Sequence, residues 1–513
     1  MDALRSDATL VDALRADLLA ADFTVARLGE LWGEDAAAAL HRGHRVPAMR
    51  TLDRAAGFEA AAVLARAFVL GLPVAAEDLA RALPTLGLDR ALGLDGALGL
   101  GLVRGTNNSF TAAIDMRPYS FTDAWGEANW WIASDLGELS TGRALREDHV
   151  LGVGGASLTL SGLMIDRPAN LTLDLGTGCG IQALHASRHS GRVVATDISA
   201  RALEYARFNA ALNGIRNIEF RLGSLFAPVA DDLFDHIVSN PPFVITPRAE
   251  GVPAYEYRDG GMVGDALVAE VIAGAAEHLK PGGVAQLLGN WEYRGTEDAF
   301  DRVASWLDAT DLDAWIVERE VQDAALYAET WIRDGGTRSG EEFDRLSEAW
   351  IADFEARGVS RVGFGYLALR KPTQLTPTLR RLERVGTPVA GTLGAHVDAT
   401  LSAFDWQASL DDVALSRALL TVAPDVTEER HYWPGDEHPA VMNLRQGGGF
   451  GRSYPLDTAL AAVVGACDGE LSIAAICAAL GDLLEVDGDA LLAEVLPTVR
   501  ELVTVGILLR PKL

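Results

Sequence analysis

Lysine is nearly absent from this sequence of 513 residues. Lys280, Lys371 and Lys512 are the only lysines, and arginine supplies the remaining basic side chains. Asp and Glu number 72 against 44 Lys and Arg, so the formal net charge is −28. This charge opposes the attraction to phosphates that drives most nucleic-acid binding. It disfavours a nucleic-acid partner without excluding one, since a local patch of arginine would suffice.

Cysteine is also scarce, and long hydrophobic runs are missing. The three cysteines, Cys179, Cys467 and Cys477, are not clustered, which predicts a reducing compartment without a disulfide framework. We therefore expect a cytoplasmic protein. The longest uncharged stretch, residues 150–165, is rich in Gly and Ser and too short to span a bilayer. We expect no membrane partner, and no spacing of His, Cys and acidic residues predicts a metal site.

The sequence does contain a glycine-rich segment directly after an apolar, β-prone run. Residues 171–180 read Leu-Thr-Leu-Asp-Leu-Gly-Thr-Gly-Cys-Gly, and a helical pattern follows from Ile181. This order predicts a strand, a tight glycine turn and a helix. Glycines let the backbone pass close to a ligand, and the start of the helix offers free N–H groups. A glycine loop alone is a weak signal, because many nucleotide-binding folds have one.

Two later segments make the glycine loop more specific. Residues 193–198 predict a short buried strand that ends in Asp197, about twenty residues after the loop. A carboxylate there suits both hydroxyls of a ribose, and the alternative is a cap of the next helix together with Ser199. Residues 234–243, Phe-Asp-His-Ile-Val-Ser-Asn-Pro-Pro-Phe, predict another strand, whose end carries Asn240 and two prolines.

The order of these three motifs resembles the class I S-adenosylmethionine (SAM)-dependent methyltransferases, over residues 148–372. The Asn-Pro-Pro-Phe ending is similar to that of the branch that methylates planar amino groups. Its members include release-factor glutamine N5-methyltransferases and adenine-N6 or guanine-N2 methyltransferases of nucleic acids. The continuation, Val244 to Pro247, looks closest to the archaeal and eukaryotic type of glutamine methyltransferase. The resemblance implies an α/β, Rossmann-like core with a mostly parallel, seven-stranded sheet and SAM as cofactor.

The resemblance also implies which residues hold the cofactor. Asp174 would support the glycine loop against the methionine end of SAM, and Asp197 would bind the ribose. Ser224 stands where the family has an Asp near the adenine, so it offers a weaker contact. Residues 149–160 match the position of a Val-Leu-x-Pro-Arg-Pro segment but are rich in glycine instead. The expected cofactor residues are Asp174, Gly176, Thr177, Gly178, Gly180, Asp197, Ile198, Ser224 and Asn240.

Asn240 carries the catalytic hypothesis. An amide or exocyclic NH₂ is a poor nucleophile, because its lone pair is delocalised. Two acceptors, Asn240 Oδ1 and the Pro241 carbonyl, would hold both N–H bonds so that the lone pair faces the methyl group. Pro241 and Pro242 stiffen the turn, and Phe243 would pack on the flat substrate group. No strong general base is needed for this chemistry. The simpler interpretation is a plain turn at the end of a strand.

The chain on the N-terminal side of the core changes character twice. Residues 1–105 read as a helical, winged-helix-like domain, which either caps the active site or recognises the substrate. Residues 106–147 read as a β-rich connector. Its aromatic residues either stack bases or pack the joint between domains, and we prefer the second interpretation.

The core and the C-terminal part have their own patterns. Residues 148–372 alternate strands and helices, with a helical insert at about 322–360. Residues 373–513 predict a winged-helix-like domain that loosely resembles PqqD-like peptide-recognition domains. Strands of the core are expected at 171–175, 192–197, 218–222, 236–240 and 283–289, and C-terminal helices at 456–467, 473–484 and 491–505.

We interpret the sequence as an enzyme, a SAM-dependent N-methyltransferase acting on a planar amide or amino nitrogen. The leading substrate is a glutamine side chain of a protein or peptide. The alternative is an adenine-N6 or guanine-N2 methyltransferase of RNA or DNA. A third hypothesis, a SAM-binding sensor or scaffold without activity, fits less well, because a mere binder has no use for two acceptors at the methyl group.

Overall fold

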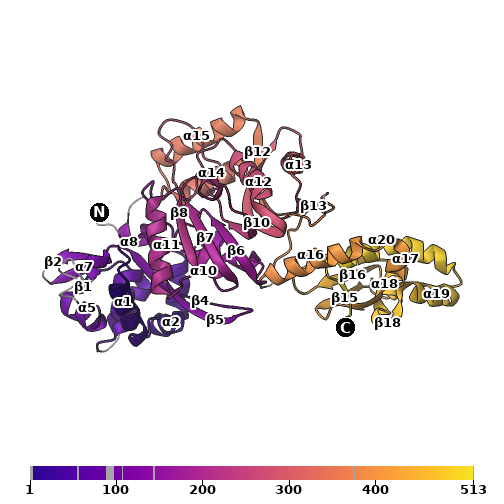
Figure 1. The fold of residues 1–513 in the computed structure, drawn as a ribbon, viewed down its shortest axis with the longest axis horizontal. Helices are drawn as coiled ribbons and strands as arrows, with labels where there is room; N and C mark the ends of the chain where they lie inside the picture. The colour runs from indigo at the N-terminus through magenta and orange to yellow at the C-terminus, as the bar shows by residue number, and fades with distance from the viewer. Residues whose placement is uncertain are drawn as a thin grey trace. The chain divides into compact units, whose positions relative to one another are not determined.

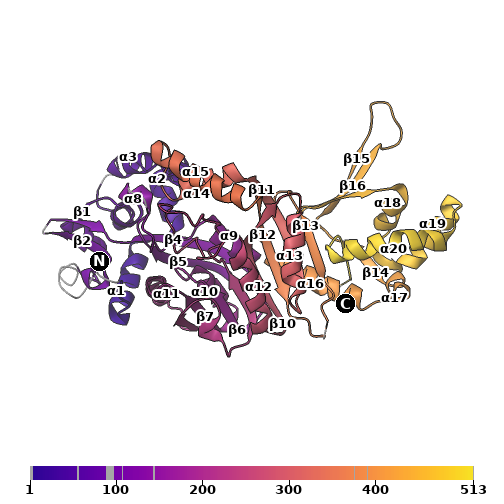
Figure 2. The same cartoon turned by 90° about the horizontal axis from the view of Figure 1, so that it is seen from above.

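The computed structural model describes residues 4–54, 57–87, 97–106, 108–142, 145–374, 376–389 and 391–511. The chain separates into two compact units (Figure 1, Figure 2). The first comprises Met1–Ser161 and Arg167–Leu382, and the second Gly162–Asp166 and Glu383–Leu513. The glycine loop, Asp197 and the Asn-Pro-Pro-Phe motif all belong to the first unit.

An eight-stranded sheet forms the centre of the first unit, in the order β13-β11-β12-β10-β9-β6-β7-β8. Strands β8, β7, β6, β9 and β10 run parallel to one another, whereas β12 is antiparallel to both of its neighbours. The predicted α/β, Rossmann-like class is confirmed, and β13 adds an edge strand to the seven expected ones. The strands are β6 (Ala169–Leu175), β7 (Ser190–Asp197), β8 (Ile218–Leu222), β9 (Phe234–Ser239), β10 (Leu279–Arg294), β11 (Asp313–Asp323), β12 (Val359–Arg370) and β13 (Arg380–Arg384).

The central parallel strands β6, β7 and β9 are buried over most of their length, because such a sheet is covered on both faces. Leu173, Val194 and Ile237, on three neighbouring strands, are fully buried in one hydrophobic cluster. Helices α10 and α11 pack on β7, and α12 and α13 pack on β10 (Figure 1). The helices of this region are α9 (Gly155–Leu163), α10 (Ile181–Ala186), α11 (Ala200–Leu212), the short 3-10 helix η2 (Ala227–Val229), α12 (Ala266–His278) and α13 (Ala299–Asp308).

The strand order reverses between β6 and β9, in the middle of the sheet. From β6 the chain moves outward through β7 to β8, and from β9 it moves the other way to β10. Ligands of open α/β sheets bind at such a switch point, beyond the carboxyl ends of the strands. The glycine loop follows β6, and Asn240 follows β9. The Ser239 hydroxyl donates to the Leu175 carbonyl at 2.8 Å and holds these two strand ends together.

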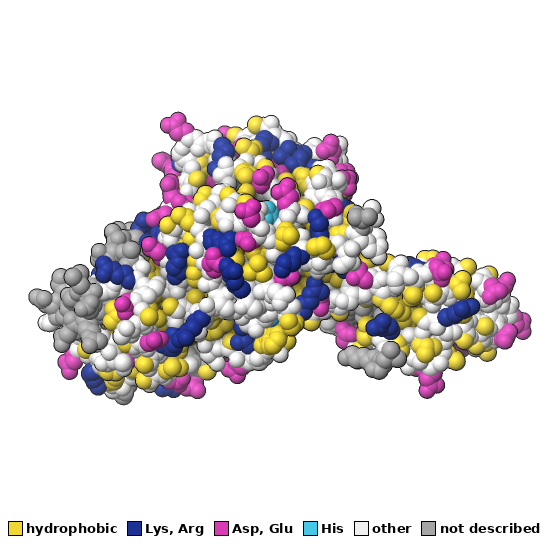
Figure 3. Space-filling view, viewed as in Figure 1, with side chains coloured by type: hydrophobic (Ala, Val, Ile, Leu, Met, Phe, Trp, Pro, Cys, Tyr) yellow, Lys and Arg dark blue, Asp and Glu magenta, His cyan; other side chains and the backbone are white. Residues whose placement is uncertain are grey.

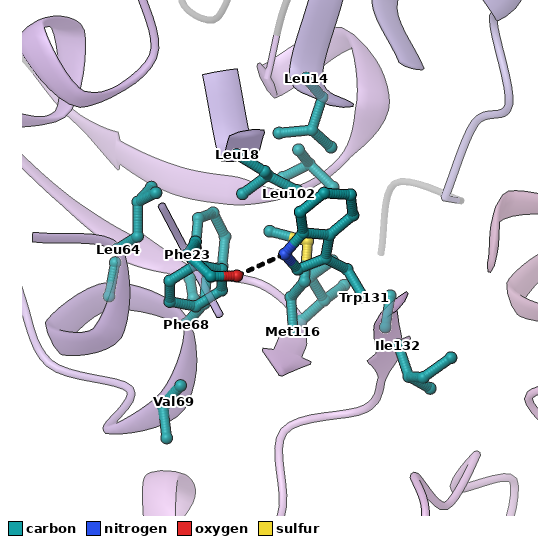
Figure 4. Packing of buried hydrophobic residues seen from close by; sticks show 14 of the residues in the cluster. Leu14, Leu18, Phe23, Leu64, Phe68, Val69, Leu102, Met116, Trp131 and Ile132 are labelled. Atoms are coloured by element: carbon teal, nitrogen blue, oxygen red, sulfur yellow. Dashed lines mark hydrogen bonds between the residues drawn. The ribbon is translucent and has the colours of Figure 1, made fainter. Parts of the chain in front are cut away.

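The N-terminal region shares one apolar core with helix α11. Figure 4 shows Trp131 among residues of α1, α4 and β4, with its indole N–H donating to the Phe23 carbonyl at 2.6 Å. Asn209 of α11 and Asn213, directly after this helix, each donate to and accept from the backbone of β5. These bonds pair Trp131 and Ala133 on the open edge of that strand. The elements are α1 (Ala8–Ala20), α2 (Val25–His41), α3 (Val46–Arg54), α4 (Ala60–Leu64), the π-helical turn η1 (Ala65–Val69), β1 (Val74–Ala75), α5 (Ala76–Ala82), α7 (Ala97–Leu100), β2 (Val103–Thr106), β3 (Ser109–Ala112), β4 (Asp115–Asp123), β5 (Gly126–Ser134) and α8 (Glu138–Thr141).

The connector aromatics pack internally, as the preferred interpretation expects. Tyr119, Phe121 and Trp130 surround the ring of His185 on α10, with centroid distances between 4.2 and 5.7 Å. The Tyr119 hydroxyl lies 3.0 Å from His185 Nε2. Trp125, at the hairpin turn, is the exception and is exposed. Rings engaged in this way are not available as a platform for stacking bases.

The helical insert consists of α14 (Ala324–Asp334) and α15 (Glu341–Ala356), between β11 and β12. Its apolar faces form a cluster of their own, in which Tyr327, Trp350 and Phe354 are fully buried. Val244 and Ile245, which directly follow the Asn-Pro-Pro-Phe motif, belong to the same cluster. The insert is therefore packed against the exit of that motif.

The second unit has a separate core around α18, α19 and α20. These helices confirm the three expected C-terminal helices, and two small sheets, β18-β14-β19 and β15-β16-β17, accompany them. The winged-helix-like assignment stays a prediction. The elements are α16 (Gly394–Ala408), α17 (Asp412–Ser416), β14 (Leu419–Val422), β15 (Val426–His431), β16 (Val441–Gln446), β17 (Ser453–Leu456), α18 (Thr458–Gly465), β18 (Asp468–Ser472), α19 (Ile473–Leu484), α20 (Gly488–Thr504) and β19 (Leu508–Leu509). Among the residues that the structure describes, none of the helices combines the length and apolar character that crossing a bilayer requires.

Candidate active site

A cavity of about 370 Å³ opens at the switch point of the sheet. This volume falls within the range of small-molecule sites. Its walls come from the loop after β6, the end of β7, the loop after β8 and the turn after β9. Of the predicted site residues, the lining includes Gly176, Thr177, Gly178, Asp197, Ile198, Ser224, Asn240, Pro241 and Pro242, while Asp174, Gly180 and Phe243 lie behind it.

The three loop glycines serve two different purposes. Gly176, Gly178 and Gly180 all have positive φ, at 75°, 55° and 92°, which favours glycine at each position. A Cβ on Gly176 or Gly178 would meet no atom within 4 Å, so these two keep the loop backbone open to the cavity. A Cβ on Gly180 would lie 3.0 Å from the backbone of Ala206. Gly180 thus allows α10 to approach α11.

Asp174 supports the loop from beneath. Its Oδ2 accepts from the Thr177 hydroxyl at 2.5 Å and from the Ala183 N–H at 2.8 Å. Its Oδ1 is buried without a hydrogen-bond partner among the described residues. Burial raises the pKa of this carboxyl to about 7, despite the two donors. Asp174 therefore shapes the loop and does not line the cavity.

Asp197 combines both roles that its position in the sequence allows. Its Oδ1 accepts from the Ser199 N–H at 2.9 Å, at the start of α11, and its Oδ2 accepts from the Gly178 N–H at 2.8 Å. Burial raises its pKa. A carboxylate has about four acceptor positions, so these bonds leave capacity for two ribose hydroxyls in the cavity. The neighbouring Ile198 exposes 66% of its surface and provides an apolar face beside the acid.

The turn after β9 presents an unused acceptor. Asn240 Oδ1 is buried and has no hydrogen-bond partner in the described part of the chain. A buried, unpaired carbonyl oxygen costs about 1–3 kcal/mol, so its retention points to a ligand that donates to it. The Pro241 carbonyl accepts from the Phe243 N–H at 2.7 Å and keeps its second lone pair. The Phe243 ring packs against the two hydrophobic clusters beside the turn, away from the lining expected for it.

Two further segments line the cavity, and the first of them was not predicted from sequence patterns. Residues 256–262 return past the motif and contribute Glu256, Tyr257 and Gly261 to the lining. The adjacent Gly260-Gly261 pair, with φ of 73° at Gly261, was the available signal. Residues 149–152 line the opposite wall, at the place where the resemblance suggested a cofactor segment. In this wall burial lowers the pKa of His149, whose Nδ1 lies 3.9 Å from Asp135 Oδ2.

The donor set fits SAM. An acid with spare acceptor positions, an open glycine loop and apolar side chains lie around one cavity. Asn240, whose Oδ1 has no hydrogen-bond partner in the described part of the chain, is another of its lining residues. The described residues hold no group of three or more His, Cys, Asp or Glu placed to bind a metal ion. The site can therefore bind a nucleoside-containing cofactor and present a second, N–H-bearing molecule to it.

Comparisons with known proteins agree with this geometry. Residues 154–303 match the family model of the methyltransferase small domain. Residues 20–113 and 399–510 match two domains of unknown function, DUF7059 and DUF7782. The flanking regions are thus recurrent domains whose descriptions assign no activity.

Curated relatives match part of the chain. The ribosomal protein uL3 glutamine methyltransferase of Bradyrhizobium diazoefficiens is 34% identical over 197 residues, which are 34% of this chain and 59% of that protein. A release factor glutamine methyltransferase of Xylella fastidiosa is 38% identical over 128 residues, which are 23% of this chain and 46% of that protein. The chain thus spans about half the length of these relatives. Together with the sheet topology, these matches show that residues 154–303 belong to the methyltransferase small domain family, within a class I methyltransferase core.

Proposed function

We propose that this protein is a SAM-dependent N-methyltransferase that methylates the side-chain amide of a glutamine in a protein. The observation that carries the proposal is Asn240, a residue of the cavity wall whose buried Oδ1 has no hydrogen-bond partner among the described residues. An amide NH₂ would supply the missing donor. The two relatives described above are named as glutamine methyltransferases of proteins, which supports the same acceptor group.

The cofactor would be held by residues of the β6 and β7 ends. Asp197 would accept hydrogen bonds from the ribose hydroxyls, and Ile198 would pack beside the adenine. Ser224, which also lines the cavity, offers one hydroxyl to the base. Gly176 and Gly178 would let the methionine end lie against the loop backbone. Bound SAM supplies an electrophilic methyl group on a sulfonium.

The residues of the motif turn orient the amide for attack. Asn240 Oδ1 and the free lone pair of the Pro241 carbonyl would each accept one N–H of the glutamine side chain. The amide lone pair then points away from both acceptors and toward the methyl group. The new N–C bond forms as the C–S bond breaks, and the nitrogen releases one proton. Positioning within about 3–3.5 Å is the main contribution of the protein.

A protein substrate also fits the charge of the chain better than a nucleic acid does. The net charge of −28 repels phosphates at long range. On the face shown in Figure 3, the Lys and Arg side chains of the first unit lie interspersed with Asp and Glu. Such a mixed surface does not favour a phosphate backbone.

Labelled methyl transfer into a cell extract tests the proposal directly. We expect the label from SAM to enter protein, to vanish with protease and to survive nuclease. Amino-acid analysis should then recover N5-methylglutamine. Activity should change little with salt, since a phosphate-binding surface would show a log–log slope of about −0.7 to −0.9 per phosphate contact. Label that survives protease and vanishes with nuclease would transfer the assignment to base methylation.

A further inference from the structure

The segment that follows the Asn-Pro-Pro-Phe motif is anchored to the helical insert. The Ile245 N–H donates to the Tyr327 hydroxyl at 2.9 Å. Tyr327 lies on α14, 82 residues further along the chain. This bond is buried, and Ile245 comes two residues after Phe243. The insert therefore holds the turn that presents Asn240 at one of its two ends.

The return segment, residues 256–262 of the cavity wall, is anchored to the same helix. The Arg258 guanidinium donates to the Trp331 carbonyl at 2.6 Å and to Asp334 at 2.8 Å. The Arg258 carbonyl in turn accepts from the Val244 N–H at 2.9 Å, so the return segment and the motif exit are also tied to each other. Tyr257, which lines the cavity, donates its hydroxyl to Asp334. Helix α14 thus organises the whole acceptor side of the site.

Tyr327 is the most deeply placed of these anchors. Its side chain is fully buried, and its ring contacts Trp350, Phe354 and Phe364. The Asn290 amide of β10 donates to the same hydroxyl at 2.8 Å. Burial raises the pKa of Tyr327, so the hydroxyl stays neutral over the physiological range. The hydroxyl oxygen is therefore fixed in space by its ring packing and by a second donor from the central sheet.

The position of the Tyr327 hydroxyl matters for the site, because the Asn240–Phe243 turn is short and stiff. Ser239 fixes its beginning through the Leu175 carbonyl, and Tyr327 fixes its end through Ile245. Two prolines between these anchors transmit their positions to the Asn240 oxygen and the Pro241 carbonyl. A misplacement of about 1 Å at a reacting centre can cost about 10²-fold in rate.

We propose that Tyr327 is a positioning residue for methyl transfer, which holds the Asn240–Phe243 turn in register from the helical insert. This inference rests on the proposed function, since it concerns the same turn. Tyr327 is not one of the residues that line the cavity. It acts through the Ile245 N–H, while the cofactor-binding loop makes no hydrogen bond to it among the described residues.

The test compares two tyrosines, Tyr327 and Tyr255, whose hydroxyls each form a hydrogen bond that involves α14 or the residue directly after it. Tyr327→Phe removes the acceptor of Ile245, whereas Tyr255→Phe removes a hydroxyl that donates to the Gly335 carbonyl at 3.2 Å, at the end of α14. We expect single-turnover methyl transfer to fall at least about 10-fold in Tyr327→Phe, with the Kd for SAM within about twofold of wild type. Tyr255→Phe should keep its rate. A Tyr327→Phe protein that binds SAM and transfers methyl at the wild-type rate would overturn the inference.

A second readout separates this inference from the proposed function. Hydrogen exchange of the Ile245 amide should accelerate in Tyr327→Phe, while the amides of the glycine loop stay protected. If wild type methylates no protein, the proposed function fails, and the exchange result still decides whether Tyr327 anchors the turn. Should Tyr327→Phe not fold, Asn290→Ala loosens the same hydroxyl and should slow transfer by a smaller factor. An unchanged rate in Asn290→Ala would then count against the inference.

Discussion

The two halves of the candidate active site are built in opposite ways. The cofactor half is held by contacts that are short in sequence: Asp174 binds groups three and nine residues away, and Asp197 binds Gly178, nineteen residues away. The acceptor half is held by contacts between residues 73 to 82 positions apart, such as Arg258 with Trp331 and Ile245 with Tyr327. Two neighbouring strands, β6 and β7, with the loop and the helix between them, therefore supply these contacts of the first half, whereas the second half depends on an inserted helix.

This difference indicates which half of the site determines specificity for the methyl acceptor. The residues expected to bind the cofactor form a local module, which the central sheet supports on its own. The acceptor wall, by contrast, receives its shape from α14 and from residues 256–262. Substitutions in the two halves should therefore separate catalysis from cofactor binding, and the three below go from the largest expected effect to the smallest.

Asn240→Ala should lower methyl transfer without weakening cofactor binding. It removes one of the two acceptors that orient the amide, and the loss of one such preorganised group typically costs about 10²–10³-fold in turnover. The Kd for SAM should stay close to wild type, because the ribose and methionine contacts remain. Single-turnover methyl transfer and calorimetry measure the two quantities on the same sample. Full transfer activity in the variant would show that the motif is only a structural turn.

Asp197→Ala should break the cofactor half. Loss of a charge-assisted acceptor costs about 1.5–3 kcal/mol, which weakens SAM roughly 10- to 150-fold. Asp197→Asn is the matched control, since it keeps an acceptor for Gly178 or Ser199 but loses the charge. Its affinity for SAM should lie between those of wild type and Asp197→Ala. Calorimetric titration with SAM and with its demethylated product checks both variants. Equal affinity in wild type and Asp197→Ala would remove Asp197 from the site.

Asp174→Asn tests the cofactor half through the pH dependence of folding stability. The pKa of Asp174 is raised to about 7 by burial, so between about pH 4 and pH 7 the folded state binds a proton that the unfolded state releases. Folding stability from this group therefore falls as pH rises through that window. The free energy of unfolding of wild type, relative to Asp174→Asn, should drop by about 1 kcal/mol from pH 6 to pH 7. Urea unfolding of both proteins measures it, and parallel curves would contradict the assignment.

The sequence by itself determined the sheet, the glycine loop and the identity of the cofactor side. The reason is locality: the apolar runs, the glycines at positive φ and the acids at strand ends carry their information within about twenty residues. The three C-terminal helices were predictable for the same reason, since their apolar periodicity is local. Asn240 was also evident, because the strand and the two prolines around it fix the direction of the turn.

Only the tertiary structure decided what surrounds Asn240. It packed Phe243 against two hydrophobic clusters, and it brought residues 256–262 into the cavity wall. It also revealed that Asn240 Oδ1 is buried without a partner among the residues that the structure describes, and that the Tyr327 hydroxyl accepts from the Ile245 N–H. None of these follows from a local pattern, and the contact of Ile245 with Tyr327 joins residues 82 positions apart. Packing of the insert against the sheet, and not the motif alone, gives the acceptor site its geometry.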